Sequence, residues 1–380
     1  CLRCFSSRLI IISDIISLYK NYVLKVDILL LELKKLTYHL YKMHEYWDKQ
    51  PTTRMYTSNE TTGLLASKPK ILPPEFIWSS CKNNEALTFL QQHYLGNSFF
   101  KLYYTPEILK WSIDNSVAIR KLTTRELVGY ITTTDVDVRI DDKVMKMAQI
   151  NYLCVHESYR NYGFAPILID EIKRRIALKN IWQAIYTAHI NIPTPISKSC
   201  YWHRFLDVKH LIKTKFHQAS HTRERYHEVH GPCKYTWKKM TNEDIPKVIR
   251  ILQEYNEKFK ITPVINEEFV KKRLLPIHSY ISDETDGFIS FYDIPCERAD
   301  GSDVVKQVYR YFMAGDVYND AFLIAKNLGY HVFNSAEAGV STELLEKMKF
   351  VKGTGYVYYY LFNWHLSEAI EPKEINLILP

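Results

Sequence analysis

The sequence predicts a mixed α/β fold in which one unit is used twice. Helix-like and strand-like patterns alternate along the chain, as in a mixed sheet covered by helices. Several segments of the first part have counterparts in the second part. In addition, the run QINYLCVHESYRNYGFAP (149–166) leads from a strand pattern, through a loop with one glycine, into a helix pattern. These observations favour an α/β protein built from two similar halves.

Composition agrees with a soluble globular chain of that size. Of the 380 residues, 46% are hydrophobic and 24% are charged, which leaves room for two domains or one duplicated unit. The balance of 50 Lys and Arg against 42 Asp and Glu gives a net charge of +8. This charge favours anionic partners such as a polyphosphate cofactor or a membrane surface. No basic block is interleaved with aromatic residues, so we expect no nucleic-acid partner.

The cysteines predict a reducing compartment. Seven cysteines are scattered without a disulfide-like framework, and we therefore expect a cytoplasmic protein with free thiols. Cys200-x-x-His203 and His230-x-x-Cys233 have the internal spacing of zinc ligands. However, Tyr201 and Trp202, which separate the first pair, are typical of packed or groove-lining aromatic residues. We therefore expect no metal.

The first forty residues are apolar but repeatedly interrupted by charge, at Asp14, Lys20, Lys25 and Asp27. No uninterrupted run is long enough to cross a bilayer, and a small-residue cleavage site is absent. We expect an amphipathic helix or pair of helices over 1–41. Such helices pack on the body, on a partner or on a membrane surface.

The internal repeat sets the expected domain organisation. A segment around Trp78 parallels one around Trp237, and a segment that begins at Gly129 parallels one that begins at Gly287. The two intervals differ by one residue, and a helix pattern and a short strand follow in both halves. Thr241 and Asp244 also form a capping-box-like start to a helix. We predict an extension over 1–41, a first half over 42–234 and a second half over 235–380.

The loop at 160–165 is an expected anion site. A helix N-terminus after a glycine presents unpaired N–H groups and the positive end of the helix dipole, which can hold a pyrophosphate. The spacing Arg160-x-x-Gly163-x-Ala165 resembles the acyl-CoA loop of the GNAT acyltransferase superfamily. Only the first half contains this loop, so we expect the other half to bind something else.

Motifs along most of the chain resemble one family within that superfamily. The segment 150–156 resembles EINFLCVHK, 349–355 resembles KFGxGDG, 44–51 resembles FWDTQP, 186–204 resembles YTAGVVLPKPVxTCRYWHR, and 358–364 resembles QYYLYNW. These are motifs of the eukaryotic glycylpeptide N-tetradecanoyltransferases, or N-myristoyltransferases. The resemblance implies two pseudo-symmetric GNAT-like halves that form one compact, saddle-like sheet covered by helices.

The resemblance also implies a reaction. A tetradecanoyl group would pass from tetradecanoyl-CoA to the amine of an N-terminal glycine, with the chain's own terminal carboxylate, here at Pro380, as the base. The backbone N–H groups of Tyr152 and Leu153 would stabilise the oxyanion. Asn151 and Thr187 would hold the amine. The alternatives are an ordinary edge strand at the C-terminus, a satisfied buried amide at Asn151 and a β-branched filler at Thr187.

The resemblance also implies the remaining site residues, because their positions match positions of the family. For tetradecanoyl-CoA these are Glu45, Tyr46, Trp47, Tyr152, Leu153, Cys154, Val155, Arg160, Asn161, Gly163, Phe164 and Ala165. For the peptide groove they are Tyr94, Phe100, Lys101, Tyr104, His189, Tyr201, His203, Phe216, Thr354 and Gly355. Aromatic residues such as Tyr46 and Trp47 are also common in plain cores.

Three departures from the family bear on function. The CoA loop has lost several basic side chains, which would weaken cofactor binding. The residues after Tyr94 are uncharged where the family is acidic, and Thr354 replaces an aspartate, while His189 stands in place of a glycine. Fewer carboxylates in the groove predict a preference for less basic peptides. Two other hypotheses are a GNAT enzyme that uses a shorter acyl-CoA and a silent scaffold that binds acyl-CoA or glycine N-termini. We expect a monomer, with peripheral membrane or ribosome association as open alternatives.

Overall fold

The computed structural model describes residues 68–94, 100–217 and 229–379. All of them belong to one unit, Pro51–Pro380. The first half contains β1 (Phe76–Ser79), α2 (Asn83–His93), β2 (Phe100–Leu102), α3 (Pro106–Ser112), β3 (Asn115–Lys121), β4 (Leu127–Ile140), β5 (Lys143–Val155), the 3₁₀ helix η1 (Glu157–Tyr162), α4 (Phe164–Ala177), β6 (Gln183–Ala188), β7 (Ser197–Phe205) and α5 (Val208–Lys213).

The second half repeats this order of helices and strands. It contains β8 (Lys238–Lys239), η3 (Asn242–Asp244), α6 (Ile245–Asn256), β9 (Ile261–Pro263), α7 (Glu267–Phe269), the π-helical turn η4 (Val270–Leu274), β10 (His278–Ile281), β11 (Phe288–Asp293), β12 (Cys296–Arg298), β13 (Val304–Val305), β14 (Gln307–Ala314), α8 (Tyr318–Asn327), β15 (Val332–Ala336), α9 (Thr342–Lys347), β16 (Val351–Phe362) and η5 (Pro372–Glu374). The expected capping box is present, because the Thr241 N–H donates to Asp244 Oδ2 at 2.9 Å.

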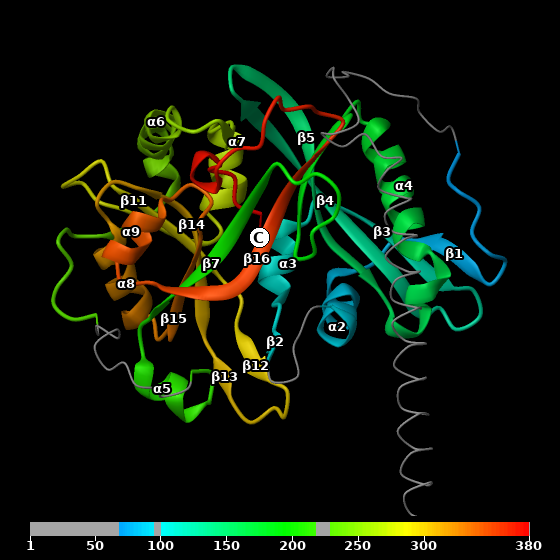
Figure 1. The fold of residues 1–380 in the computed structure, drawn as a ribbon, viewed down its shortest axis with the longest axis horizontal. Helices are drawn as coiled ribbons and strands as arrows, with labels where there is room; N and C mark the ends of the chain where they lie inside the picture. Colours follow the sequence, from blue (N-terminus) through cyan, green and yellow to red (C-terminus); the bar gives the residue numbers. More distant parts are fainter. Residues whose placement is uncertain (1–67, 95–99, 218–228, 380) are drawn as a thin grey trace, which may run out of the picture. The chain divides into compact units, whose positions relative to one another are not determined.

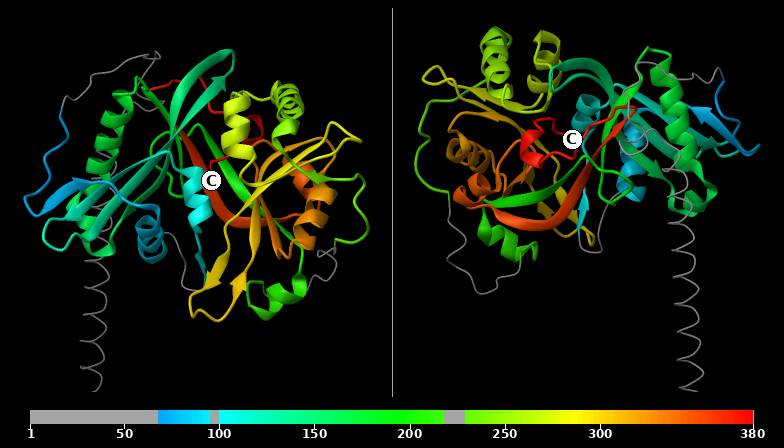
Figure 2. Two further views of the ribbon diagram at one scale, coloured as in Figure 1. Left: turned by 180° about the vertical axis from the view of Figure 1, so that it is seen from behind. Right: turned by 45° about the horizontal axis from the view of Figure 1, so that its top comes forward.

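The large sheet is pseudo-symmetric about its centre. Its strand order is β1-β3-β4-β5-β6-β16-β7-β15-β14-β11-β10-β8, with β9 on the side of β4. Each first-half strand along this order therefore has a counterpart at the mirrored position, and the two halves exchange β7 and β16 at the centre, whereas β2 belongs to a separate small sheet with β12 and β13. These two strands are antiparallel neighbours that run through the middle of the unit (Figures 1 and 2). The predicted mixed α/β fold with two similar halves is thereby confirmed.

The repeated glycines lie where a helix packs closely on the sheet. A Cβ atom on Gly129 would come within 2.9 Å of Leu168 Cδ1 on α4. A Cβ atom on Gly287 would come within 2.8 Å of Val317 Cγ1, just before α8. The sequence echo thus reflects the same close packing, used once in each half.

The core of the described residues has one large cluster and several smaller ones. On one face, buried side chains from α2, α3 and α6 form a single cluster that also includes Leu377, Ile378 and Leu379. On the other face, α4 covers β3 and β4, while α8 and α9 cover strands of the second half. The last described residues therefore lie within the layer shared by both halves.

Candidate active site

A β-bulge interrupts β5 at two of the predicted catalytic residues. Thr132 pairs with Asn151 and Tyr130 pairs with Cys154, so Tyr152 and Leu153 both lie opposite Ile131. A bulge leaves its extra residue outside the ladder. Tyr152 has a φ of 50°, which is uncommon for a bulky residue. The neighbouring structure maintains this conformation, because the Tyr152 hydroxyl lies 2.9 Å from Ser112 Oγ on α3.

The parallel pair β5 and β6 separates directly before this bulge. Their ladder ends at Ile150 and Tyr186, although β5 continues to Val155 and β6 to Ala188. Beyond this point Thr187 is in register with Tyr359 of β16. Asn151 Nδ2 is buried and has no hydrogen-bond partner among the described residues. Because such groups are normally satisfied, an unpartnered amide at a splayed pair of strands is a natural contact for a ligand.

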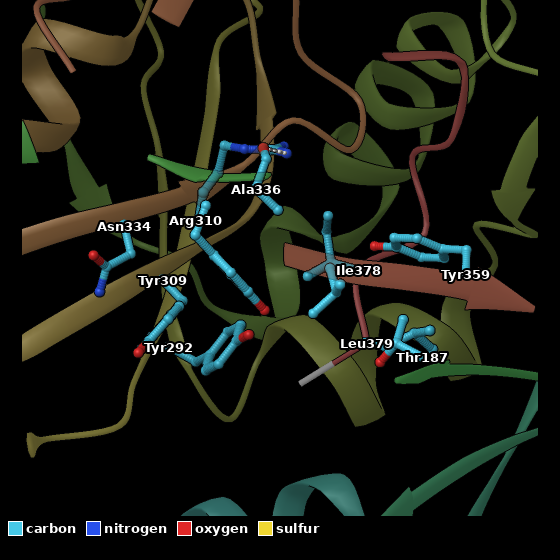
Figure 3. A pocket seen from close by; sticks show the side chains of 11 residues that line it. Thr187, Tyr292, Tyr309, Arg310, Asn334, Ala336, Tyr359, Ile378 and Leu379 are labelled. Atoms are coloured by element: carbon cyan, nitrogen blue, oxygen red, sulfur yellow. Dashed lines mark hydrogen bonds between the residues drawn. The ribbon is translucent and has the colours of Figure 1, made fainter. Parts of the chain in front are cut away.

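A cavity brings Thr187 together with the end of the described chain (Figure 3). Ile378 and Leu379 form part of its wall, and both side chains are buried. The segment before them is anchored, because the Asn376 N–H donates to the carbonyl of Ile261 at 2.8 Å. The cavity is lined by Thr187, Tyr201, Tyr292, Tyr309, Arg310, Asn334, Ala336, Val357, Tyr359, Ile378 and Leu379.

The predicted phosphate loop has the expected backbone form. Gly163 has a φ of 74°, and a Cβ atom there would meet nothing within 4 Å, so the glycine is needed for conformation rather than for space. It precedes α4, whose N-terminus receives no side-chain cap. Asn161 is exposed beside it, and Ala165 lies in the first turn of α4. Phe164 is fully buried against Phe76, so only its backbone faces the loop.

Three other predicted cofactor residues are Arg160 in η1 and Cys154 and Val155 at the end of β5. An Arg160 Nη2 group donates to the carbonyl of His93 at 2.9 Å, which ties the loop to the end of α2. Burial raises the pKa of the Cys154 thiol to about 12, so this cysteine is an inert thiol beside the bulge. Val155, which ends β5, is partly buried.

The predicted groove residues fall into three clusters. Tyr94 and Tyr104 surround Tyr152, with ring centroids 6.1 Å and 5.4 Å from it. Burial raises the pKa of Tyr152 to about 12 despite its hydrogen bond to Ser112, so this hydroxyl stays neutral at physiological pH. Phe100 and Phe216 make an edge contact at 5.2 Å, and Lys101 on β2 is exposed beside them.

The third cluster lies on β7 and β16. Lys352 pairs with Trp202 and Tyr356 pairs with Cys200, so the Gly-Thr-Gly segment bulges out opposite Tyr201. The carbonyl of Tyr201 and the ring of His203 approach Gly353 so closely that no Cβ atom fits there. Thr354 is exposed, and Gly355 lies over the ring of Tyr201.

Two histidines near this bulge have fixed partners. His203 Nδ1 lies 2.7 Å from Asn334 Oδ1, and burial lowers the pKa of His203 despite that hydrogen bond. His189, exposed after β6, has Nδ1 3.2 Å from the carbonyl oxygen of Tyr356.

Of the lining residues, only Thr187 and Tyr201 belong to the sequence-based set, and Tyr292, Tyr309, Arg310 and Asn334 are among those absent from it. All four come from β11, β14 and β15 of the second half. The internal repeat is the signal that could have found Arg310, because NYLC of β5 corresponds to RYFM of β14 in the mirrored strand order.

Some predictions lie outside the described residues. These are Glu45, Tyr46 and Trp47, the uncharged segment 95–99, the extension 1–41 and Pro380. Among the residues that the structure does describe, no group of three or more His, Cys, Asp or Glu side chains could hold a metal ion. Within the same ranges, none of the helices has both the length and the apolarity that crossing a bilayer requires.

The splayed parallel strands, the bulge and the open helix N-terminus define a class, an α/β acyltransferase. The family model of the myristoyl-CoA:protein N-myristoyltransferase N-terminal domain matches residues 57–200, and the model of its C-terminal domain matches 212–377. Glycylpeptide N-tetradecanoyltransferase 1 of Arabidopsis thaliana is 31% identical over 89% of this chain and 89% of its own length. The Danio rerio glycylpeptide N-tetradecanoyltransferase 2 is 31% identical over 88% of this chain and 77% of its own. The chain therefore belongs to the N-myristoyltransferase family.

Solved structures agree on the fold. The Saccharomyces cerevisiae N-myristoyltransferase with bound myristoyl-CoA superposes with a TM-score of 0.78 at 24% identity, covering 89% of this chain and 94% of that one. The two-halved sheet is therefore the fold of that enzyme as well.

Proposed function

We propose that this chain transfers a tetradecanoyl group from tetradecanoyl-CoA to the amine of an N-terminal glycine. Family membership supports the reaction and its two substrates. The observation that carries the mechanism is the cavity in which Thr187 meets Ile378 and Leu379. One further residue brings the chain to Pro380, whose carboxylate we assign as the base.

The proton steps follow from this assignment. An α-amine has a reference pKa near 8 and an α-carboxyl near 3.5, so the unperturbed gap is about four units. Burial of both groups raises the carboxyl value and lowers the amine value, which narrows the gap. The carboxylate takes a proton from the glycine ammonium, and Asn151 and Thr187 hold the amine beside it. The neutral amine can then attack the thioester carbonyl.

The bulge in β5 supplies the groups that would stabilise the oxyanion formed in the next step. As the carbon–nitrogen bond forms, the carbonyl oxygen gains negative charge, which the Tyr152 and Leu153 N–H groups would stabilise. Collapse of this species breaks the carbon–sulfur bond and releases the CoA thiolate, which takes up a proton. The open N-terminus of α4 supports the CoA phosphates, with Gly163 allowing the backbone to approach.

Substrate preference is the finer part of the proposal. The exposed Thr354 provides no carboxylate to attract a lysine of the peptide, and the exposed Lys101 on β2 adds a positive charge. The enzyme should therefore favour glycine peptides that are less basic than those typical of its family. We further propose a cytoplasmic monomer with its halves at 42–234 and 235–380, and with peripheral membrane or ribosome association.

Acyl transfer to a short glycine peptide, with its N-acetylated form as control, tests the reaction. A glycine-dependent product is expected, and only the free amine should react. A variant extended by a few residues past Pro380 tests the base. It should bind tetradecanoyl-CoA but lose turnover, whereas full activity would exclude the terminal carboxylate. Binding without turnover in the parent chain would instead favour a scaffold.

A further inference from the structure

The second half contains a counterpart of the splayed strands, and it is closed by an arginine. The ladder between β14 and β15 ends at Tyr309 and Asn334, the mirrored place in the sheet. Arg310 and Ser335 follow this ladder as Asn151 and Thr187 follow the first one. Arg310 Nε donates to Ser335 Oγ at 2.9 Å, and an Nη2 group donates to the carbonyls of Ala336 and Ala338.

The charge of Arg310 is not balanced by these partners. The residue is 4% exposed, and its hydrogen-bond acceptors in the described chain are a hydroxyl and two main-chain carbonyls. Glu337 is the acid nearest to those carbonyls along the chain. Its carboxylate accepts instead from the Cys200 N–H and from Trp202 Nε1, and its described ion pair is with Lys352. A buried guanidinium without a counter-ion is unfavourable, so a carboxylate would be strongly held here.

The cavity beside Arg310 offers neutral groups and no other described charge. Burial raises the pKa values of the Tyr201, Tyr292, Tyr309 and Tyr359 hydroxyls, so these line the cavity as neutral groups. Tyr318 lies on α8 and is an electrostatic neighbour of Arg310. Its hydroxyl is also neutral, because burial raises its pKa to about 12. Burial also lowers the pKa of His203, which leaves this imidazole neutral at physiological pH.

We propose that Arg310 is the counter-ion of a carboxylate that occupies this cavity during acyl transfer. The inference rests on the proposed function. Two sources share this chemistry: the chain's own terminal carboxylate, one residue beyond the cavity-lining Leu379, and an acidic side chain of the glycine peptide. In the first case Arg310 keeps a buried carboxylate ionised at neutral pH, ready to accept the glycine proton. Arg310 is then a positioning residue for the base.

The test compares Arg310→Gln, which removes the charge, with Arg310→Lys, which retains it. For an uncharged glycine peptide, kcat/KM is measured against pH, and thermal unfolding and tetradecanoyl-CoA binding verify the fold. If the carboxylate belongs to the chain, the acid limb of Arg310→Gln moves up by about one pH unit or more, and Arg310→Lys stays near the parent. If the carboxylate belongs to the peptide, the acid limb of the pH profile of Arg310→Gln is the same as that of the parent. In that case Arg310→Gln raises KM about tenfold or more for a peptide with Asp but not for its Asn isostere.

A second pair of variants retains the arginine. Ser335→Asp places a carboxylate next to Arg310 Nε and should mimic Arg310→Gln, whereas Ser335→Asn should not. Folded variants that retain both the acid limb and the Asp-to-Asn discrimination of the parent would overturn the proposal. Failure of the proposed function is a different result, because the parent chain itself would then make no acylated peptide.

Discussion

The two halves place different side chains at the same point of the same topology. In the first half the parallel ladder ends before Asn151, whose buried Nδ2 has no partner in the described part of the chain, and before Tyr152 with its φ of 50°. In the second half the ladder ends before Arg310, whose guanidinium donates a hydrogen bond to Ser335 Oγ on β15. A bulge follows in both halves, at Tyr152 and Leu153 in the first and at Tyr311 and Phe312 in the second.

The comparison indicates what would make the first half the proposed reaction centre. The sheet, the bulge and the helix after it are common to both halves, so they alone do not create the site. The difference lies in whether the space between the splayed strands is open or filled. In the proposed mechanism the amide of Asn151 leaves this space open for a thioester and an amine, whereas Arg310 fills the corresponding space with its own hydrogen bonds. Four changes would break or sharpen this contrast.

The largest effect is expected from Asn151→Arg, which gives the first half the residue of the second. The guanidinium should fill the space between β5 and β6 and abolish both tetradecanoyl-CoA binding and acyl transfer. Asn151→Ala is the matched control, because it removes the amide but leaves the space open and should still bind the cofactor. Calorimetric titration and thermal unfolding measure the two effects. Cofactor binding by a folded Asn151→Arg protein would contradict the comparison.

The next effect concerns the backbone donor in the bulge. Leu153→Pro removes one N–H group in a bulge, which is one of the sheet positions where proline occurs. Because proline restricts the residue before it and Tyr152 has a φ of 50°, thermal unfolding checks that the variant stays folded. Loss of one oxyanion donor typically reduces kcat about 10²–10³-fold, and we expect a loss of that order with little change in cofactor affinity. Leu153→Ala shortens the side chain but retains the N–H and serves as control. Similar kcat values for the two variants would show that this N–H takes no part.

A smaller effect is expected at the phosphate loop. Gly163→Ala and Gly329→Ala both place a side chain in the left-handed region, at φ values of 74° and 83° with nothing nearby to clash. Each should lower the free energy of unfolding by about 1 kcal/mol. Only Gly163→Ala should also raise the KM for tetradecanoyl-CoA, because Gly163 precedes the helix assigned to the phosphates. Equal KM values for the two variants would remove the loop from the cofactor site.

The smallest effect concerns a pair of histidines, His210 on α5 of the first half and His331 of the second half. The rings of His210 and His331 stack at 3.7 Å, and burial, together with His210, lowers the pKa of His331 to about 4. Between about pH 6.5 and pH 4 the unfolded chain binds a proton at this site that the folded protein does not. The free energy of unfolding should therefore decrease as the pH is lowered from about 6.5 to about 4. His331→Asn should flatten the dependence of unfolding temperature on pH there, and an unchanged slope would contradict this origin.

Much of the fold could be predicted because its signals are local. The apolar pattern and glycine at 149–166 specify β5, the loop and α4, and the Thr241 and Asp244 cap marks the helix that follows. Thr187 and Tyr201 were predicted from motifs, and both line the cavity. Asn334 was missed because no motif marks it, and Arg310 was missed because its correspondence to Asn151 becomes visible only in the mirrored order of strands that are far apart in the sequence.

The sequence by itself determined the repeated unit, the order of its helices and strands and the loop before α4. Hydrogen-bonding patterns and apolar periodicity act over a few residues and can be read directly from the chain. Only the tertiary structure decided that β16 inserts between β6 and β7, that Leu379 lines the cavity of Thr187 and that Arg310 mirrors Asn151. These contacts depend on how whole layers pack, because burying the shared apolar face brings the two halves and the end of the chain together.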